Sequence, residues 1–232
     1  MISVVNGVKD RAKLISAGVG AFGLVGCIAG WILDPRDFFV SYLFAHFFFL
    51  GLSLGALGLL MIHHLTGGYW GYSVRRFFES AVGNLPLLAV LFVPLFFGLP
   101  YLYPWKNSSL VAADEILRSR FNYLNTPGYV MRTIIVFGVW IVMARLLLKW
   151  SAAQDVTVSV EPTRKLRTLS GPGLVIYPMT MTFAGVDWLM SLEKDWYSTM
   201  FAVMICIGQV LSALAFVILL VSSATRSRQL GP

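Results

Sequence analysis

The sequence is poor in charged residues and in cysteine. Only 12% of its 232 residues are Asp, Glu, Lys or Arg, whereas 57% are hydrophobic and the mean hydropathy is +0.75. A soluble domain cannot bury so much apolar side chain, because its surface is too large relative to its core. The two cysteines, Cys27 and Cys206, both lie in apolar runs, which excludes a disulfide framework and a cysteine metal site. The composition therefore predicts an integral membrane protein surrounded by the lipid bilayer.

A basic patch with interleaved aromatics and a pair of histidines at one membrane depth on facing helices are also missing. The net charge is +7, but the basic residues do not gather on a polar element with interleaved aromatics, so we exclude nucleic-acid binding. A membrane haem b needs two axial ligands at one depth on facing helices, and among the three histidines only His46 lies at its level. Bis-histidine haem is therefore excluded, His/Met ligation is a minor alternative, and we predict no metal, haem or iron–sulfur cluster in this chain. A redox role would require a diffusible partner such as a quinone.

Long apolar runs dominate the sequence. About 20 apolar residues, at about 1.5 Å per residue, cross a hydrocarbon core of roughly 30 Å. Six runs predict transmembrane helices over about residues 14–33, 41–65, 80–103, 129–150, 172–192 and 197–223. Residues 110–121 are expected to form an amphipathic surface helix. We therefore predict an all-α, polytopic fold with a single transmembrane domain, residues 1–232.

The lysines and arginines are unevenly divided between the two sides of this arrangement. With the N-terminus inside, 12 of the 18 basic residues fall on the inner side and 6 on the outer side. Cytoplasmic loops carry an excess of Lys and Arg, so the count predicts that both termini are cytoplasmic.

The helix predicted over residues 41–65 has a face of small residues. Gly51, Gly55 and Gly58 fall on one side of it, and Gly51 and Gly55 are separated by the spacing that lets another helix approach closely. We expect this face to pack against a neighbouring helix.

A polar stripe lies about 150° away on the same helix, formed by His46, Ser53 and His64. The two histidines are 18 residues apart, or about 27 Å along the axis. The alternative is that His64 lies among the lipid headgroups and that His46 is a hydrogen-bonded core residue.

Asp187 lies within the helix predicted over 172–192, where a carboxylate is costly unless it is paired or hydrated. Thr180 shares its face, and Tyr177 lies close to that line. His46 is predicted at a similar depth, so the two could face each other as proton acceptors. Alternatively, Asp187 reaches the membrane surface or caps a loop.

Two further polar residues extend a possible proton path from His64 and Ser53. Gln209 is near the middle of the last predicted helix, and Arg145 is one turn inside the inner end of the helix over 129–150. Gln209 could instead make a hydrogen bond between helices, and Arg145 could simply reach the headgroups.

Two segments resemble a known family. They are LFAHFFFLGLSLGALGLLMIHHLTGGYWGYSVRRFFESAVGNLPLLAVLFVPL and VDWLMSLEKDWYST. They are similar to the membrane-embedded quinone-binding subunits of bacterial alternative complex III, which are related to the membrane anchors of polysulfide and nitrite reductases. The resemblance covers about residues 35–220 and is closest to the second, smaller paralogue.

The resemblance implies a subunit of a respiratory quinol:cytochrome c oxidoreductase in the bacterial inner membrane. Its partners would be an iron–sulfur subunit, haem c subunits and the paralogous membrane subunit, and its diffusible cofactor would be menaquinone or ubiquinone. The family's quinol pocket maps onto His46 and Asp187. The predicted helices two to five would form the first of the family's two four-helix bundles, and the second bundle would be mostly absent from this chain.

Three functions therefore remain open. The chain is expected to bind quinol and accept its protons, to act as a scaffold without chemistry of its own, or to transport protons or a solute along its polar stripes. The transporter alternative would be supported by paired half-helix breaks at corresponding positions, which the sequence does not show.

Overall fold

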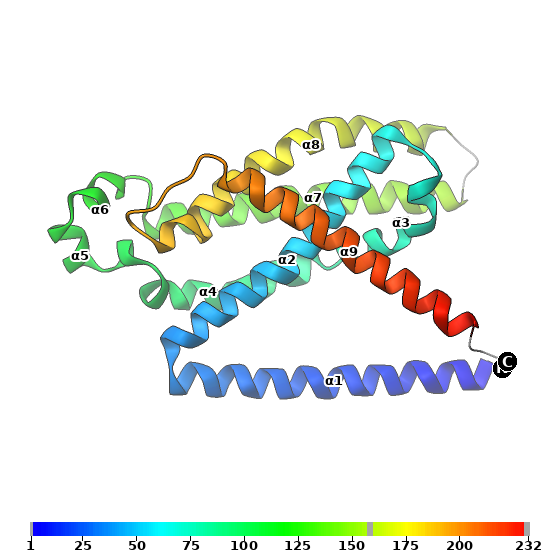
Figure 1. The fold of residues 1–232 in the computed structure, drawn as a ribbon, viewed down its shortest axis with the longest axis horizontal. Coiled ribbons are helices and arrows are strands. Elements are labelled where there is room, and N and C mark those ends of the chain that lie inside the picture. Colours follow the sequence, from blue (N-terminus) through cyan, green and yellow to red (C-terminus); the bar gives the residue numbers. More distant parts are fainter. Residues whose placement is uncertain (1, 157–159, 230–232) are drawn as a thin grey trace.

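The computed structural model describes residues 2–156 and 160–229, and within them every regular element is a helix. The predicted all-α, polytopic membrane fold is confirmed (Figure 1). The elements are α1 (Ile2–Leu33), α2 (Pro35–Thr66), α3 (Tyr69–Val82), α4 (Leu85–Leu102), η1 (Pro104–Lys106), α5 (Ser108–Ala113), α6 (Glu115–Arg120), α7 (Thr126–Val156), α8 (Glu161–Trp188), η2 (Met190–Leu192) and α9 (Phe201–Gln229).

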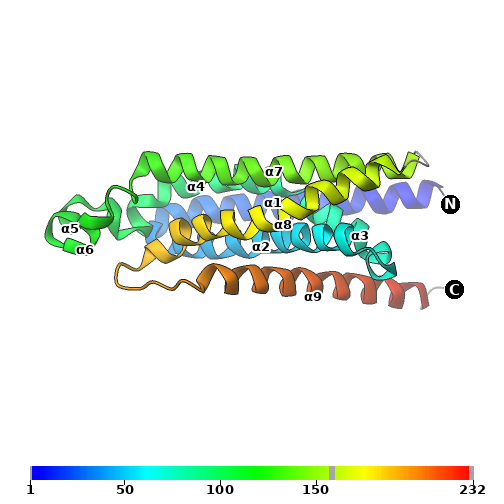
Figure 2. The same cartoon turned by 90° about the horizontal axis from the view of Figure 1, so that it is seen from above.

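Five segments of the described chain are long and apolar enough to cross a membrane. They are Leu14–Leu33, Pro35–Thr66, Val74–Leu102, Thr126–Asp155 and Phe201–Ser223. The span predicted over 172–192 is not among these five and corresponds to the C-terminal part of α8, whose first turns are charged. Those charges lower its apolar character, yet α8 has 28 residues and contacts both α7 and α2 (Figure 2).

Four helices form a ring of contacts. Helix α2 contacts α4 and α8. Helix α7 contacts the same two helices and closes the ring opposite α2. These correspond to the predicted helices two to five, so the described residues form the expected four-helix arrangement. Large aromatic side chains fill its interior, among them Phe92, Trp140 and Trp188, each at most 1% exposed.

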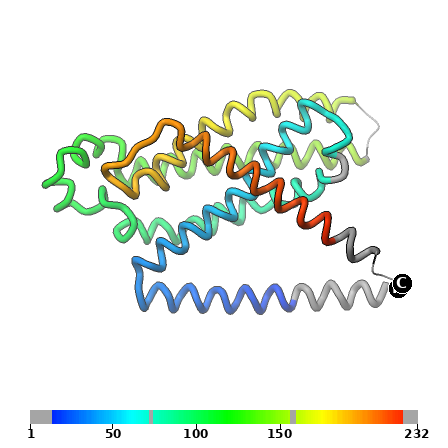
Figure 3. The backbone as a smooth tube through the Cα atoms, in the orientation of Figure 1, coloured from blue at the N-terminus to red at the C-terminus, as the bar shows by residue number. Residues whose placement is uncertain are grey.

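Helix α9 crosses α2 outside this ring (Figure 3). At the crossing, a Cβ on Gly55 would overlap the backbone carbonyl of Gln209, and a Cβ on Gly51 would lie 3.2 Å from the Gln209 side chain. Gly58 faces Tyr177 of α8. The predicted small-residue face is thus confirmed as a helix contact, because only glycine allows the two backbones to approach so closely.

Two predicted elements differ from the structure. The span predicted over 80–103 is preceded by the unpredicted helix α3 and interrupted by a turn at Gly83 and Asn84. The single surface helix predicted over 110–121 is wrong, since α5 and α6 are separate helices. The side chain of Asp114 accepts hydrogen bonds from the backbone N–H groups of Ile116 and Leu117, which starts a new helix at that point.

Helix α1 lies apart from the ring, and it contacts α2 and, through Trp31, Phe97 of α4. The turn between them is fixed by Asp34, which caps α2 by accepting hydrogen bonds from the N–H groups of Arg36 and Asp37. Five basic side chains that entered the orientation count lie outside the described part of the structure, namely those of Lys9, Arg11, Lys13, Arg226 and Arg228.

Candidate functional site

Polar side chains gather at two opposite ends of the bundle. We call them the α5/α6 end, where α4 leads into η1 and α8 leads into η2, and the α3 end, where α2 leads into α3 and α7 leads towards α8 (Figure 1).

The centre of the α5/α6 end is an ion pair between α7 and α8. Arg132 Nε donates a hydrogen bond to Asp187 Oδ2 at 2.6 Å, and Arg132 Nη2 donates to Oδ1 at 3.1 Å. Asp187 is 1% exposed, so its charge is balanced inside the protein. A bidentate guanidinium and carboxylate pair is the geometry that best compensates such burial.

Arg132 is held on its other side by Tyr123. Its guanidinium carbon lies 3.9 Å from the centre of the Tyr123 ring, and Nη2 also donates to the Tyr123 carbonyl at 3.0 Å. Burial, and then the nearby charge of Asp187, raise the pKa of Tyr123 to about 12, so this phenol stays neutral at physiological pH. The neutral ring stabilises the cation by a cation–π contact.

A hydrogen-bonded aromatic layer covers this ion pair. Tyr103 donates to the Trp188 carbonyl at 2.9 Å, and its hydroxyl lies 3.2 Å from that of Tyr129. Ser191 donates to the Asp187 carbonyl at 2.6 Å and accepts from the Trp105 indole at 3.3 Å. These bonds fix the C-terminal turn of α8, and with it the position of the carboxylate.

The expected direct pairing of His46 with Asp187 is not present among the described residues, because the hydrogen-bond partner of the carboxylate is Arg132. The His46 ring lies 5.3 Å from that of Phe92, whose ring is 4.7 Å from Trp188. The imidazole therefore contacts Phe92, which in turn contacts Trp188, the residue after Asp187. His46 is 6% exposed, and its Nε2 has no hydrogen-bond partner.

The other residues predicted to bind quinone have partners within the protein. Thr180 accepts a hydrogen bond from the Trp140 indole at 2.8 Å and donates to the carbonyl of Ile176. Tyr177 donates to Gln209 Oε1 at 2.5 Å, which joins α8 to α9 near the middle of both helices. For Gln209, the alternative of an interhelical hydrogen bond is thus present.

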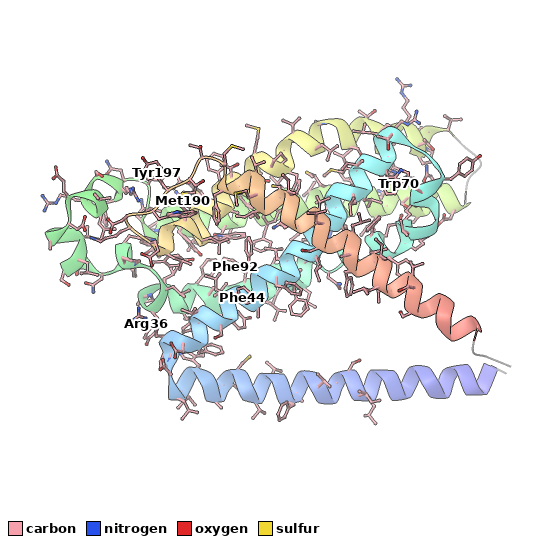
Figure 4. All side chains as sticks on the ribbon, in the orientation of Figure 1. Arg36, Phe44, Trp70, Phe92, Met190 and Tyr197 are labelled. Carbon is pink, nitrogen blue, oxygen red and sulfur yellow. The ribbon has the colours of Figure 1, made fainter. Side chains whose placement is uncertain are left out.

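Two of the pockets at the α5/α6 end adjoin the C-terminal ends of α4 and α8. One of about 520 Å³ lies beneath α5 and α6 and is lined by residues that include Arg36, Tyr103 and Lys194. The other, of about 220 Å³, lies between the end of α8 and the start of α9 and is lined by Met190 and Tyr197 among others (Figure 4). Neither pocket is lined by any of the four predicted quinone-binding residues, His46, Tyr177, Thr180 and Asp187.

The α3 end is organised around Glu79, a charged residue that is 7% exposed. Arg75 Nε pairs with Glu79 Oε1 at 2.8 Å, and Arg76 Nη1 pairs with Oε2 at 2.6 Å. Ser151 of α7 also donates to this carboxylate. Arg76 pairs in turn with Asp155, so charged side chains join α3 to the end of α7.

A pocket of about 400 Å³ opens beside this network, and it is lined by His63, His64, Gly67, Arg75, Arg76, Gln154, Asp155, Thr163 and Arg167. His64 lies at the opposite end of α2 from His46, with the buried Ser53 between them. Arg145 is not part of the pocket. It lies on the exposed side of α7, in agreement with the alternative that it reaches the headgroups. The cations beside His64 come instead from α3 and α8.

Two functional groups were missed by reasoning from sequence. The role of Glu79 was detectable, because Arg75 and Arg76 precede it by four and three residues, the spacing of ion pairs on one helix face. Arg132 also carried a signal, since it is a cation within an apolar run, but nothing in the sequence names Asp187, 55 positions later, as its partner.

No protein-family description and no curated protein matches this chain.

Proposed function

We propose that this chain is a membrane subunit of a quinol:cytochrome c oxidoreductase of the alternative complex III type, in which the α5/α6 end binds quinol or carries its protons. The observation that carries the proposal is His46. Its buried Nε2 has no hydrogen-bond partner, and an unsatisfied buried polar atom costs free energy unless it has a role. A quinol hydroxyl is a partner that such a nitrogen can bind.

Asp187 supports the same proposal as a buried carboxylate at this end. Quinol supplies two electrons and two protons on oxidation, so its site requires groups that accept protons. His46 would bind a quinol hydroxyl, while Arg132 would hold the Asp187 carboxylate in place as a second proton acceptor. Tyr177 and Thr180 fit less well, because their hydroxyl groups already donate to Gln209 and Ile176.

The proposal includes the environment of the chain. We place it in the bacterial inner membrane with both termini cytoplasmic, so that the α5/α6 end faces outwards towards the iron–sulfur and haem c subunits. In support, the α3 end gathers Arg75, Arg76, Arg164, Lys165 and Arg167, as the positive-inside rule expects of a cytoplasmic end.

A scaffold role in the same complex is the second candidate. The observation that favours it is that Asp187, Thr180, Tyr177 and Gln209 all have partners within the chain, which is sufficient to explain them as structural residues.

Quinol:cytochrome c turnover of the purified complex separates these two functions. We expect His46→Ala to lower turnover about 10²-fold, the scale of losing a general base. Asp187→Asn is combined with Arg132→Gln so that no unpaired charge is buried, and this double variant should lose turnover to a similar extent. The control is Asp195→Asn, which removes an exposed carboxylate. Normal turnover in both test variants, with intact assembly, would favour the scaffold.

A further inference from the structure

The pocket at the α3 end contains a cation that no described residue neutralises. Arg76 is paired with Glu79 and Asp155, and Arg75 is bound to Glu79, Gln154 and Ser151. Arg167 lines the same pocket from α8, and within residues 2–156 and 160–229 it has no hydrogen bond or ion pair. The pocket therefore has one guanidinium group in excess of its carboxylates.

A second, independent feature of the pocket is His64. His64 is only 8% exposed, and its Nε2 is buried without a hydrogen-bond partner among the described residues. An imidazole nitrogen that carries a proton is a hydrogen-bond donor, and leaving it unsatisfied in a buried position costs free energy. An unpaired guanidinium and an unsatisfied imidazole that line one pocket together favour a ligand with several acceptor oxygens and negative charge.

The pocket also lies at the depth expected for lipid headgroups. The apolar span of α2 ends at Thr66, and α3 begins immediately afterwards with Tyr69 and Trp70. Trp70 is 45% exposed at this end of the molecule (Figure 4). Tyrosine and tryptophan at the ends of apolar spans mark the membrane interface, which is where phospholipid phosphates lie.

We propose that this pocket binds the phosphate group of an anionic phospholipid, with Arg167 and His64 as its donors. The planar guanidinium matches two phosphate oxygens, and basic pockets between transmembrane helices are known sites for such headgroups. Gly67 leaves space beside the guanidinium, since even a Cβ there would lie 4.0 Å from Arg167 Nη2, and its φ of 69° is one that glycine adopts most easily. This proposal is independent of the quinol function.

The test measures lipid binding by the full chain, purified in nonionic detergent and depleted of lipid. Phosphatidylglycerol, phosphatidylcholine and inorganic phosphate are added separately, and binding is followed by native mass spectrometry and thermal unfolding. We expect retention of phosphatidylglycerol and a higher unfolding temperature with it than with phosphatidylcholine. Arg167→Gln should weaken phosphatidylglycerol binding at least 10-fold, whereas the control Arg164→Gln, three residues earlier on α8 and beside a different pocket, should not.

His64→Gln is the second variant, because an amide keeps a donor while removing the imidazole, and it should weaken binding less than Arg167→Gln. Equal retention of phosphatidylglycerol by wild type and Arg167→Gln would overturn the proposal, as would equal stabilisation by phosphatidylcholine. Stabilisation by inorganic phosphate alone, with no effect of the lipid, would overturn the assignment to a phospholipid.

Discussion

The two ends of the bundle use the same chemical groups in different ways. At the α5/α6 end a single guanidinium meets a single carboxylate beneath an aromatic layer, and the Asp187 side chain is only 2% exposed. At the α3 end Glu79 is shared by two arginines, Arg76 is 56% exposed, and a pocket opens beside them. We therefore expect a buried pair in strict balance to depend on both partners, and a shared network to tolerate the loss of one.

The largest loss of stability at either end is expected from Arg132→Gln. It leaves Asp187 buried without its cation, and removing one partner of a buried ion pair typically costs about 3–5 kcal/mol. We expect a large fall in thermal stability, and the added substitution Asp187→Asn should restore much of it, because it removes the uncompensated charge. The two variants are compared by thermal unfolding in detergent. A double variant as unstable as the single one would show that the pair is not the cause.

Sequence reasoning captured the long apolar helices well, since their length and hydropathy are local properties. It missed α3, because a short amphipathic helix containing Arg75 and Arg76 has the composition of a loop. It identified Asp187 from the cost of burying a carboxylate, but its expected neighbour was His46. The actual partner depends on the rotation of α7 about its own axis, which brings Arg132 to Asp187, and on Phe92, which lies against the imidazole. Neither is encoded by spacing within one helix.

A smaller effect is expected from Glu79→Gln at the α3 end. Arg75 keeps its bonds to Gln154 and Ser151, and Arg76 keeps Asp155, so neither cation loses every acceptor. We expect a loss of about 1–3 kcal/mol, the cost of an incompletely satisfied buried group.

The matched control for that experiment is Glu161→Gln. Glu161 pairs with Lys165 on the exposed surface of α8, where solvent screens an ion pair and leaves it little effect on stability. Thermal unfolding of both variants is compared with that of Arg132→Gln. If Glu79→Gln proved as destabilising as Arg132→Gln, the two ends would not differ in the way proposed.

The smallest effect concerns the ion pair between Asp114 and Lys194, which joins the α5/α6 segment to the chain after η2. The Lys194 ammonium holds the pKa of the Asp114 carboxyl below its ordinary value, and Asp114 raises the pKa of Lys194. The aspartate contribution is therefore complete above about pH 3.9 and is lost as the pH falls through the lowered pKa. The lysine contribution is complete below about pH 10.4 and is lost as the pH rises through the raised pKa.

Asp114→Asn isolates this charge effect, because asparagine still caps α6 by accepting from the N–H groups of Ile116 and Leu117. At pH 7 we expect slightly faster amide hydrogen exchange in α6 of the variant than of the wild type, once both are corrected for intrinsic rates. The difference should disappear in acid, below the lowered pKa of Asp114, because the wild-type carboxyl is then neutral as well. Asp195→Asn, whose carboxylate lies 3.9 Å from Lys194, should change exchange less. A difference that persisted unchanged in acid would assign the effect to the cap instead of the ion pair.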